Sequence, residues 1–437
     1  MLDINLIRNE PDKVREGVEK KGMNPNVVDE FLSLDEKWRG AVSALDETRA
    51  KQNGITERLS KKSFSADERE GAVLEAKKLK ERVSELEREE RVLQAEREET
   101  LLRIPNLPFP DVPVGKDERA NKELRIVGKK RDFAREGFKP KDHLEIGEAL
   151  GILDFERGAR VAGSGFYFLK NEAVLLELGL VRYALDVLAK KGFQLVFTPD
   201  MARDRFYLGT GYQPRGPEAQ TYQIQGTDLG LIATAEVTLA GLHADEILKE
   251  GELPKLYAGY SHCYRQEAGA YGKYSKGLYR VHQFTKVEMF AYTTPEESEK
   301  THQKFLGLEE EIWKGLGIPY RVLHMCTGDL GSQAARKYDL EAWMPGRPPA
   351  GPDGTVGAGG WGEITSTSNT TDFQARRLGI KFRKKDGTLG FAHTVNGTAI
   401  ATSRAIVAIL ENYQKKDGSV EMPKVLKKYV GKRVIRG

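Results

Sequence analysis

The clearest hydrophobic pattern lies in the N-terminal quarter of the chain. Apolar side chains recur every three or four residues from Phe31 to Leu59 and from Ala72 to Leu93, and no proline occurs between Asn26 and Ile104. A helix with one such stripe buries it against a partner. The pattern predicts two long helices packed as an antiparallel coiled coil, each on the order of 50 Å long for about 35 residues at ~1.5 Å per residue.

This predicted helical pair is strongly charged, with a turn at Lys61 to Asp67 in which Ser65 caps the second helix. Between Asp29 and Glu99 it holds 15 Lys and Arg against 19 Asp and Glu, a net charge of −4, which leaves +8 for the rest of the chain. Attraction to an anionic partner must therefore come from local groups of cations. The candidates are Arg49, Lys51, Arg58, Lys61 and Lys62, then Lys77, Lys78, Lys80 and Arg82, and in the C-terminal tail Lys424, Lys427, Lys428, Lys432, Arg433 and Arg436.

A proline-rich stretch ends the helical pattern. Ile104 to Gly115 holds four prolines, which cannot continue a helix. We therefore predict an N-terminal helical domain over 1–104, a linker over 105–118 and a second domain over 119–437. In the second domain, short strand-like and helical runs mix without a regular βαβ order, which favours an α+β fold around an antiparallel sheet flanked by helices.

Strand patterning on both sides of a basic, glycine-rich loop predicts a β-hairpin between Tyr264 and Phe290. It places Arg265 and Glu267 on one strand and Glu288 on its antiparallel neighbour. An arginine in this position can clamp a phosphate with two N–H groups, and a carboxylate two residues on points to the same face. A hairpin with a solvated, charged loop is the alternative interpretation.

A second candidate for phosphate binding lies downstream. A glycine turn at Asn396 to Thr398 leads into an apolar helix predicted from Ala399 to Asn412, which contains Arg404 amid small residues. An unpaired charge inside a packed helix costs several kcal/mol, so Arg404 needs an anionic partner. A structural carboxylate and a phosphate both meet this requirement.

These segments together resemble class II aminoacyl-tRNA synthetases, and specifically the seryl-tRNA synthetases. The hairpin resembles motif 2, Asn396 to Arg404 resembles motif 3, and the predicted helix at 173–190 with its strand at 192–199 resembles motif 1, the dimer-forming element. Further family-like strings are Thr234-Ala235-Glu236, Met325 to Pro345 and Gly362 to Arg377. The resemblance extends from the N-terminal helix to about Pro423.

The resemblance implies a site for ATP, magnesium and L-serine. Arg265 would hold the α-phosphate, Glu267 the adenine and Arg404 the γ-phosphate, and these three would carry catalysis. The wider sets it implies are Gln266, Val281, Ile364 and Thr365 for ATP, Glu363 and Ser366 for both ATP and Mg²⁺, and Thr234, Ala235, Glu236, Glu288 and Thr398 for serine.

The implied reaction forms seryl-adenylate from L-serine and ATP and transfers serine to the 3′ end of tRNA(Ser), with tRNA(Sec) open as a second acceptor. The N-terminal arm would grip the tRNA, and the protein would be a homodimer. Two rivals stay open: a paralogue that binds without charging tRNA, and an amino acid ligase for another acceptor. The first should have lost Arg265, Glu267, Glu288 or Arg404, and the second should lack the arm.

Composition agrees with a large enzyme of the cytoplasm, although an organelle after removal of a presequence stays open. The 437 residues include no run of 18 apolar residues, which predicts no membrane segment. Cys263 and Cys326 are too few and too far apart for a disulfide framework or a four-ligand zinc site. Gly346 to Gly360 is rich in glycine and proline and is predicted to be an exposed flexible insertion.

Overall fold

The structure is a computed structural model that describes residues 1–60, 66–212, 220–267, 276–347 and 359–437. It divides into two compact units, Met1–Pro105 and Asn106–Gly437. Most of the turn predicted at Lys61 to Asp67, with Ser65, and most of the predicted insertion at Gly346 to Gly360 lie outside the described residues.

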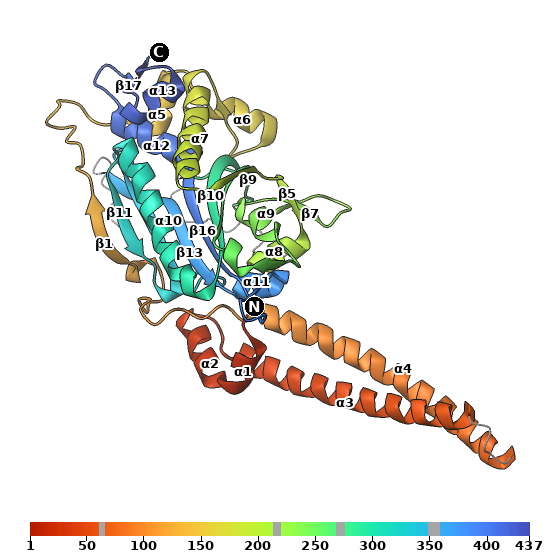
Figure 1. Ribbon diagram of the computed structural model, residues 1–437. Coiled ribbons are helices and arrows are strands. Elements are labelled where there is room, and N and C mark those ends of the chain that lie inside the picture. Colours follow the sequence, from red (N-terminus) through yellow and green to blue (C-terminus); the bar gives the residue numbers. More distant parts are fainter. Residues whose placement is uncertain (61–65, 213–219, 268–275, 348–358) are drawn as a thin grey trace. The chain divides into compact units, whose positions relative to one another are not determined.

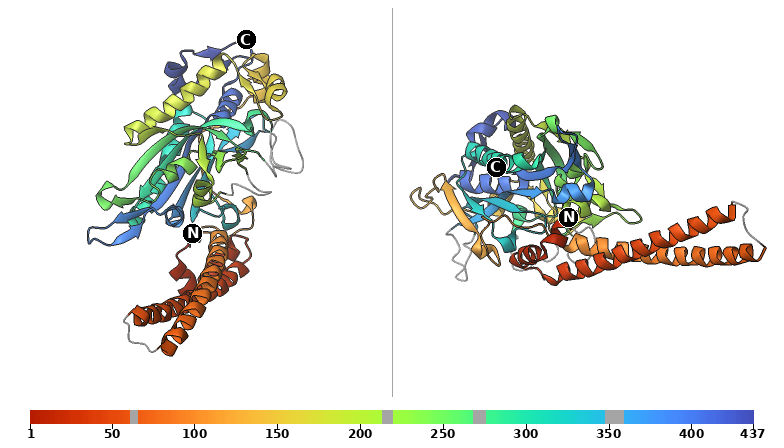
Figure 2. Two further views of the ribbon diagram at one scale, coloured as in Figure 1. Left: turned by 90° about the vertical axis from the view of Figure 1, so that its right-hand side faces the viewer. Right: turned by 60° about the horizontal axis from the view of Figure 1, so that its bottom comes forward.

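The described part of the first unit consists of helices. They are α1 (Ile4–Asn9), α2 (Pro11–Lys20), α3 (Asn26–Ser60) and α4 (Ala66–Arg103). Helices α3 and α4 run antiparallel and side by side (Figure 1, Figure 2), which confirms the predicted helical pair.

The seam between α3 and α4 changes in burial along its length. Phe31, Ala41 and Leu45 on α3 and Leu86 on α4 are buried, in the half of the pair whose α3 residues also contact α1 and α2. The seam positions nearer the connection, such as Ile55, are only half-buried. Hydrophobic stabilisation per turn therefore decreases away from α1 and α2.

A buried cluster of charges joins α1, α3 and α4. The Asp35 carboxylate on α3, with 1% of its side chain exposed, accepts hydrogen bonds from Arg8 on α1 at 2.8 and 2.9 Å and from Arg97 on α4 at 2.7 Å. Arg97, 9% exposed, also lies over the rings of Phe31 and Trp38. Removing the carboxylate would leave the Arg97 charge buried without its partner.

We predict that Asp35→Ala lowers the free energy of unfolding of the first unit by about 3–5 kcal/mol, the typical effect of breaking a buried ion pair. Amide hydrogen exchange of the α1–α4 peptides in the full chain measures this. Asp46→Ala is the control, because Asp46 is exposed on the same helix, and it should stay within about 0.5 kcal/mol of the unmodified protein. Equal effects of the two substitutions would contradict the role given to this cluster.

An eight-stranded sheet forms the centre of the second unit. Its order is β1 (Lys122–Val127), β11 (Tyr320–His324), β12 (Arg336–Met344), β13 (Gly360–Thr371), β16 (His393–Ala401), β10 (Gln283–Thr293), β9 (Lys255–Tyr264) and β4 (Gln194–Phe197). Neighbouring strands are antiparallel, except that β4 and β9 are parallel. The predicted α+β class, with an antiparallel sheet flanked by helices, is confirmed.

Long helices cover this sheet. Helix α10 (Pro295–Leu316) packs on β13 and β16, and α12 (Thr402–Tyr413) packs on β12, on α7 (Glu172–Lys190) and on α5 (His143–Ala149) (Figure 1). The core between these layers contains Phe305, Trp313 and Leu340, all fully buried. Apolar burial on this scale is the main stabilising contribution.

Shorter elements complete the second unit. They are α6 (Phe155–Ala162), α8 (Asp204–Thr210), α9 (Glu236–Gly241), α11 (Phe373–Leu378) and α13 (Lys427–Val430), with strands β2 (Leu153–Asp154), β3 (Phe168–Leu169), β5 (Met201–Arg203), β6 (Tyr222–Gln223), β7 (Leu229–Leu231), β8 (Ile247–Lys249), β14 (Lys381–Arg383), β15 (Leu389–Phe391), β17 (Val420–Glu421) and β18 (Val434–Ile435). The 3₁₀ turns of the described residues are η1 (Glu118–Ala120), η2 (Glu250–Glu252), η3 (Gly277–Tyr279), η4 (Thr327–Asp329) and η5 (Lys424–Leu426).

Two segments differ from expectation. The helix expected from Ala399 begins at Thr402, and Asn396 to Ala401 belong to β16 instead, because their backbone groups pair with β10 and β13. The proline-rich segment from Asn106 onward packs within the second unit: Asn106 N donates to Ser332 O at 2.8 Å, and Val112 joins a buried apolar cluster.

Candidate functional site

Strand β10 lies at the centre of the candidate site. It pairs with β9 on one side and β16 on the other, and its residues from Phe284 to Thr293 are buried. The register places Glu288 opposite Thr398 of β16. Glu288 therefore lies on a strand with antiparallel neighbours, as the sequence predicted.

The expectation that Arg265 and Glu267 lie on a strand is wrong, because β9 ends at Tyr264. The backbone N–H of Arg265 still donates to His282 O at 2.9 Å. This hydrogen bond lies one residue beyond the last pair of β9 and β10, Tyr264 and Gln283. Glu267 then takes φ of 52°, a left-handed conformation, and its side chain accepts from Arg280 Nη1 at 2.6 Å. This turn in the backbone, rather than strand alternation, orients the Glu267 carboxylate.

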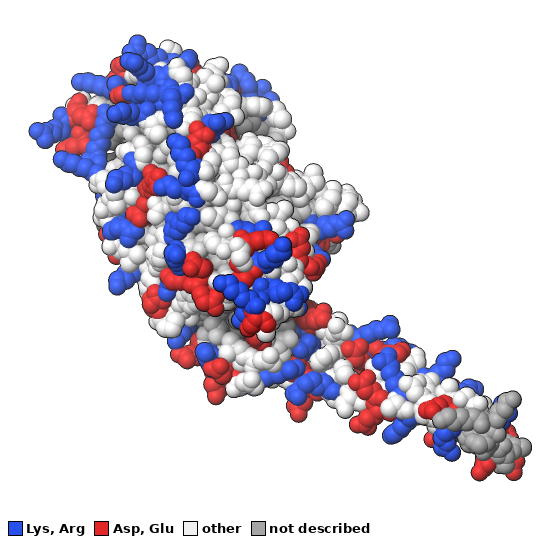
Figure 3. Space-filling view, viewed as in Figure 1, with Lys and Arg blue, Asp and Glu red and all other residues white. Residues whose placement is uncertain are grey.

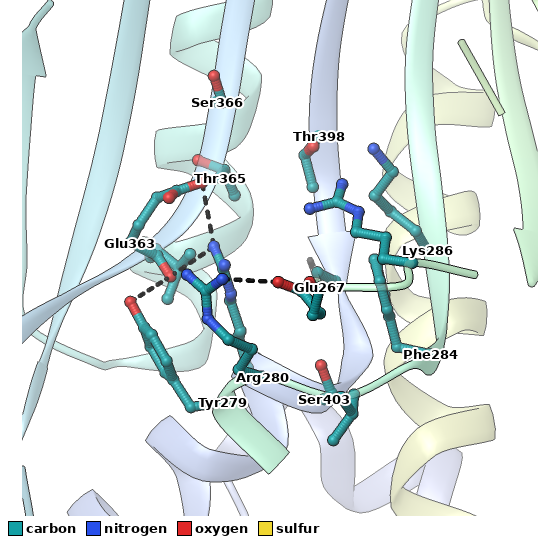
Figure 4. A pocket seen from close by; sticks show the side chains of 15 residues that line it. Glu267, Tyr279, Arg280, Phe284, Lys286, Glu363, Thr365, Ser366, Thr398 and Ser403 are labelled. Atoms are coloured by element: carbon teal, nitrogen blue, oxygen red, sulfur yellow. Dashed lines mark hydrogen bonds and ion pairs between the residues drawn. The ribbon is translucent and has the colours of Figure 1, made fainter. Parts of the chain in front are cut away.

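A pocket collects most of the predicted residues (Figure 4). Its walls come from the ends of β10, β13 and β16, from η3 and from the start of α12. The predicted residues that line it are Arg265, Glu267, Val281, Glu363, Ile364, Thr365, Ser366, Thr398 and Arg404. Segments far apart in the sequence thus meet in one cavity.

Arg404 faces a carboxylate in this pocket. Its Nη1 lies 3.0 Å from Glu363 Oε1 and donates to Glu363 O at 3.1 Å, and its guanidinium lies 5.0 Å from the Tyr279 ring centre. Burial alone would raise the pKa of Glu363, but the charge of Arg404, aided by Lys337 and Arg265, outweighs it and lowers the pKa to about 2. Of the two partners open for Arg404, the structural carboxylate is the one present here.

Arg265 is differently placed. Its Nε donates a long hydrogen bond to Ala233 O at 3.4 Å, and its guanidinium lies 5.2 Å from the Phe284 ring centre. It makes no ion pair with the part of the chain that the structure describes. Arg265 thus offers N–H donors to an anion in the pocket.

A buried ion pair lies at one side of the pocket, with Lys286 in the pocket wall. Lys286 Nζ lies 2.5 Å from Glu288 Oε2, with 7% and 3% of the two side chains exposed, and Thr398 Oγ1 donates to the same oxygen at 3.3 Å. The two residues are two apart on β10, so their side chains share a face.

Glu236 forms a second acidic position deeper in the unit. Its carboxylate accepts hydrogen bonds from Gln374 Nε2 at 2.8 Å, Asn396 Nδ2 at 2.9 Å and the Tyr212 hydroxyl at 2.9 Å, while Thr234 Oγ1 accepts from Glu236 N at 3.2 Å. Burial, followed by the nearby Glu288 carboxylate, raises the pKa of Glu236 to about 7.

Comparisons with known proteins agree with this geometry. Residues 1–108 match the seryl-tRNA synthetase N-terminal domain, and residues 221–413 match the tRNA synthetase class II core domain (G, H, P, S and T). A serine–tRNA ligase of Rubrobacter xylanophilus is 52% identical over 437 residues, which cover 100% of this chain and 99% of the relative. The chain belongs to the seryl-tRNA synthetase family. A relative from Dictyoglomus turgidum with the same printed name is 50% identical, over 100% of this chain and 99% of its own.

Solved structures extend the comparison to the fold. The seryl-tRNA synthetase of Pyrococcus horikoshii complexed with ATP superposes with a TM-score of 0.89 at 45% identity, and the cytoplasmic enzyme of Naegleria fowleri in complex with AMP with 0.84 at 36%. Each match covers 100% of this chain and 99% of the other. The predicted family is therefore confirmed.

Some predicted residues of this member of the seryl-tRNA synthetase family do not line the described pocket. Gln266 uses its backbone N–H and its side chain to bind the carbonyls of Gln220 and Thr221, which fixes the end of the hairpin. Ala235 is fully buried against the β9 backbone. Thr234, Glu236 and Glu288 are buried next to the pocket rather than in its wall. No helix among the described residues has the length and apolar content to span a membrane.

Sequence reasoning missed several pocket residues in this seryl-tRNA synthetase family member: Tyr279, Arg280, Phe284, Lys286, Ala401 and Ser403. Lys286 had a usable signal, because strand alternation puts it on the same face as Glu288. Tyr279 and Arg280 had none, since they depend on turn η3. That turn is held by the buried His143, whose Nε2 accepts from Leu278 N at 3.2 Å.

The raised pKa of Glu236 gives a prediction for pH dependence. A carboxyl whose pKa rises from 4.5 in the unfolded chain to about 7 in the folded chain binds protons preferentially in the folded state between these values. Its contribution to stability therefore falls as pH rises from 4.5 to 7. Glu236→Gln keeps a similar shape and cannot ionise, so the melting temperature of the variant, relative to the unmodified protein, should be higher at pH 8 than at pH 5.

The control for this comparison is Glu118→Gln, an exposed carboxylate on η1. Its melting temperature relative to the unmodified protein should be the same at both pH values. If Glu236→Gln also showed no change between pH 5 and pH 8, the inferred protonation of Glu236 would be incorrect.

Proposed function

We propose that this protein is a serine–tRNA ligase, which forms seryl-adenylate and pyrophosphate from L-serine and ATP and then transfers serine to the 3′ end of tRNA(Ser). The observation that carries the proposal is the convergence of Arg265, Glu363 and Arg404 on one pocket in a chain that is half identical to serine–tRNA ligases over its full length.

The first step needs orientation and charge neutralisation more than proton transfer. The serine carboxylate attacks the α-phosphorus of ATP, a new O–P bond forms, and the bond to pyrophosphate breaks. Because the nucleophile is already anionic, no general base is required. Arg265, which has no ion pair among the described residues, binds the α-phosphate, where fixed N–H donors stabilise developing charge.

Arg404 and Glu267 complete the proposed ATP contacts. Arg404 binds the γ-phosphate by exchanging part of its interaction with Glu363, and Glu267 accepts from the adenine amino group while Arg280 holds its carboxylate. Arg404 lies over Tyr279, which restricts its motion. Val281, Ile364 and Thr365 supply the remaining wall of this subsite.

Serine would bind between the carboxylates of Glu236 and Glu288. Glu236 in its ionised form accepts from the ammonium group, with Thr234 and the backbone of Ala235 beside it. Glu288 and Thr398 contact the hydroxyl, and Lys286 orients the Glu288 carboxylate. Alanine would leave the hydroxyl contact of this buried carboxylate unmade, which disfavours alanine by about 1–3 kcal/mol.

The residues fit a magnesium ion held jointly with ATP. Glu363 and Ser366 supply carboxylate and hydroxyl oxygens, the hard ligands that Mg²⁺ prefers, and both line the pocket. The described residues contain no group of three or more His, Cys, Asp or Glu side chains that could hold a metal alone, which agrees with shared coordination by phosphates. When bound, the ion would neutralise phosphate charge.

Further proposals concern assembly and location. Leu175, Leu178, Leu195 and Phe197, from α7 and β4, expose 42%, 56%, 47% and 68% of their surface. An apolar group of this kind supports a homodimer formed through the α7–β4 region. The two cysteines are unpaired thiols, which agrees with the reducing cytoplasm as the site of action.

Serine-dependent exchange of pyrophosphate into ATP, followed by charging of tRNA(Ser), tests the proposal. Arg404→Ala should lower the exchange kcat/KM by about 10²-fold or more, because it removes a donor that acts on transition-state charge. Arg383→Ala, an exposed arginine on β14, is the matched control, and thermal unfolding verifies that both variants fold. Near-normal exchange by Arg404→Ala would remove the phosphate assignment.

The arm gives a separate test of tRNA binding. Replacing residues 48–84 with a short Gly-Ser linker shortens α3 and α4 but keeps the Asp35 cluster intact. Serine activation should persist, whereas tRNA charging should fall at least tenfold through a higher KM, because contacts to RNA phosphates disappear. Unaltered charging by the shortened protein would make the arm a spacer or protein-binding element.

A further inference from the structure

The C-terminal segment concentrates positive charge outside the pocket. Lys415 to Gly437 holds eight Lys and Arg against two Asp and Glu, a net charge of +6, whereas the whole chain carries +4. None of these residues lines the pocket described above.

This segment is folded rather than a loose tail. Strands β17 and β18 pair with each other, and Leu426, Val430 and Ile435 are buried in the main core. Val430 also packs against α7 so closely that a Cβ at Gly179 would lie 2.9 Å from it. The cations therefore project from a fixed scaffold, and an ordered scaffold loses less entropy when it binds a partner.

Only part of this charge is compensated. Lys415 and Lys427 pair with Glu421 at 3.1 and 3.2 Å, and Lys432 pairs with Glu172. Five exposed cations make no ion pair with the described residues, and we call them the C-terminal cation surface: Lys416, Lys424, Lys428, Arg433 and Arg436. Lys and Arg gather at the end of the second unit that carries β17 and α13 (Figure 3).

We propose that the C-terminal cation surface binds the phosphodiester backbone of the tRNA substrate, an inference that rests on the proposed function. Uncompensated cations attract a polyphosphate by displacing its counterions, and they need no enclosed cavity. No large hydrophobic side chain from Lys415 to Gly437, all of which the structure describes, is exposed. An anionic bilayer would gain from such side chains, so the composition favours RNA over a membrane.

The test replaces all five cations with glutamine in the full-length protein. A matched variant replaces five exposed cations elsewhere in the second unit, Lys249, Lys300, Arg383, Lys384 and Lys385, so that the net charge falls equally in both variants. Pyrophosphate exchange, the KM for a tRNA(Ser) transcript and the salt dependence of transcript binding are measured for both, together with binding to vesicles of anionic phospholipid.

We expect unchanged pyrophosphate exchange in both variants. The C-terminal variant should show a KM for tRNA higher by on the order of tenfold, and a logarithmic salt slope reduced by roughly 0.7–0.9 for each phosphate that it no longer neutralises. The proposal would be overturned if the C-terminal variant had the same KM for tRNA and the same salt slope as the matched variant. It would also be overturned if the C-terminal variant alone lost binding to vesicles while its KM for tRNA stayed unchanged. If the unmodified protein did not charge tRNA, the proposed function itself would fail.

Discussion

The candidate site depends on three ion pairs, one of them buried and two partly exposed. Lys286 pairs with Glu288, Arg404 with Glu363, and Arg280 with Glu267. Leaving Lys286 or Glu288 unpaired would be strongly destabilising, because both side chains are buried. The pairs therefore restrict how β10, β13 and α12 align, and all of their members except Glu288 line one pocket. The charged groups of the pocket are thus held in place by contacts within the protein itself.

A buried hydrogen bond fixes the turn that closes the pocket. His143 Nδ1 lies 2.9 Å from Glu411 Oε1, and both side chains are fully buried. Because His143 Nε2 accepts from Leu278 N, its proton resides on Nδ1 and is donated to Glu411. Glu411 belongs to α12, the helix that carries Arg404. The pair thus ties η3, with Tyr279, to the helix that places the second arginine.

Periodic patterns in the sequence predicted the parts of the fold that local chemistry determines. The α3–α4 pair followed from apolar spacing, and α7 and β4 followed from a change of period near Gly192. The start of α12 did not follow, since Ala399-Ile400-Ala401 is a short apolar run that suits a strand and a helix equally. Only its pairing with β10 decides that it is a strand.

The site residues that belong to a sequence motif could be predicted. The contacts between residues of distant segments could not. Arg265, Glu363 and Arg404 carry the family resemblance and line the pocket together. Glu236 also carries the resemblance, but its hydrogen-bond partners Tyr212, Gln374 and Asn396 lie far apart in sequence and were not predicted. Hydrogen-bond partners of this kind arise only from the folded topology, and no local pattern encodes them.

The declining burial along the α3–α4 seam has a mechanical consequence. Where the seam is fully buried and joined by the Asp35 cluster, opening the helices exposes much apolar surface and separates buried charges. Toward the connection each turn buries less, so the free energy of local opening falls. The helical pair is therefore stiffer in the half near α1 and α2, and the half near the connection bends and twists at a lower cost in free energy.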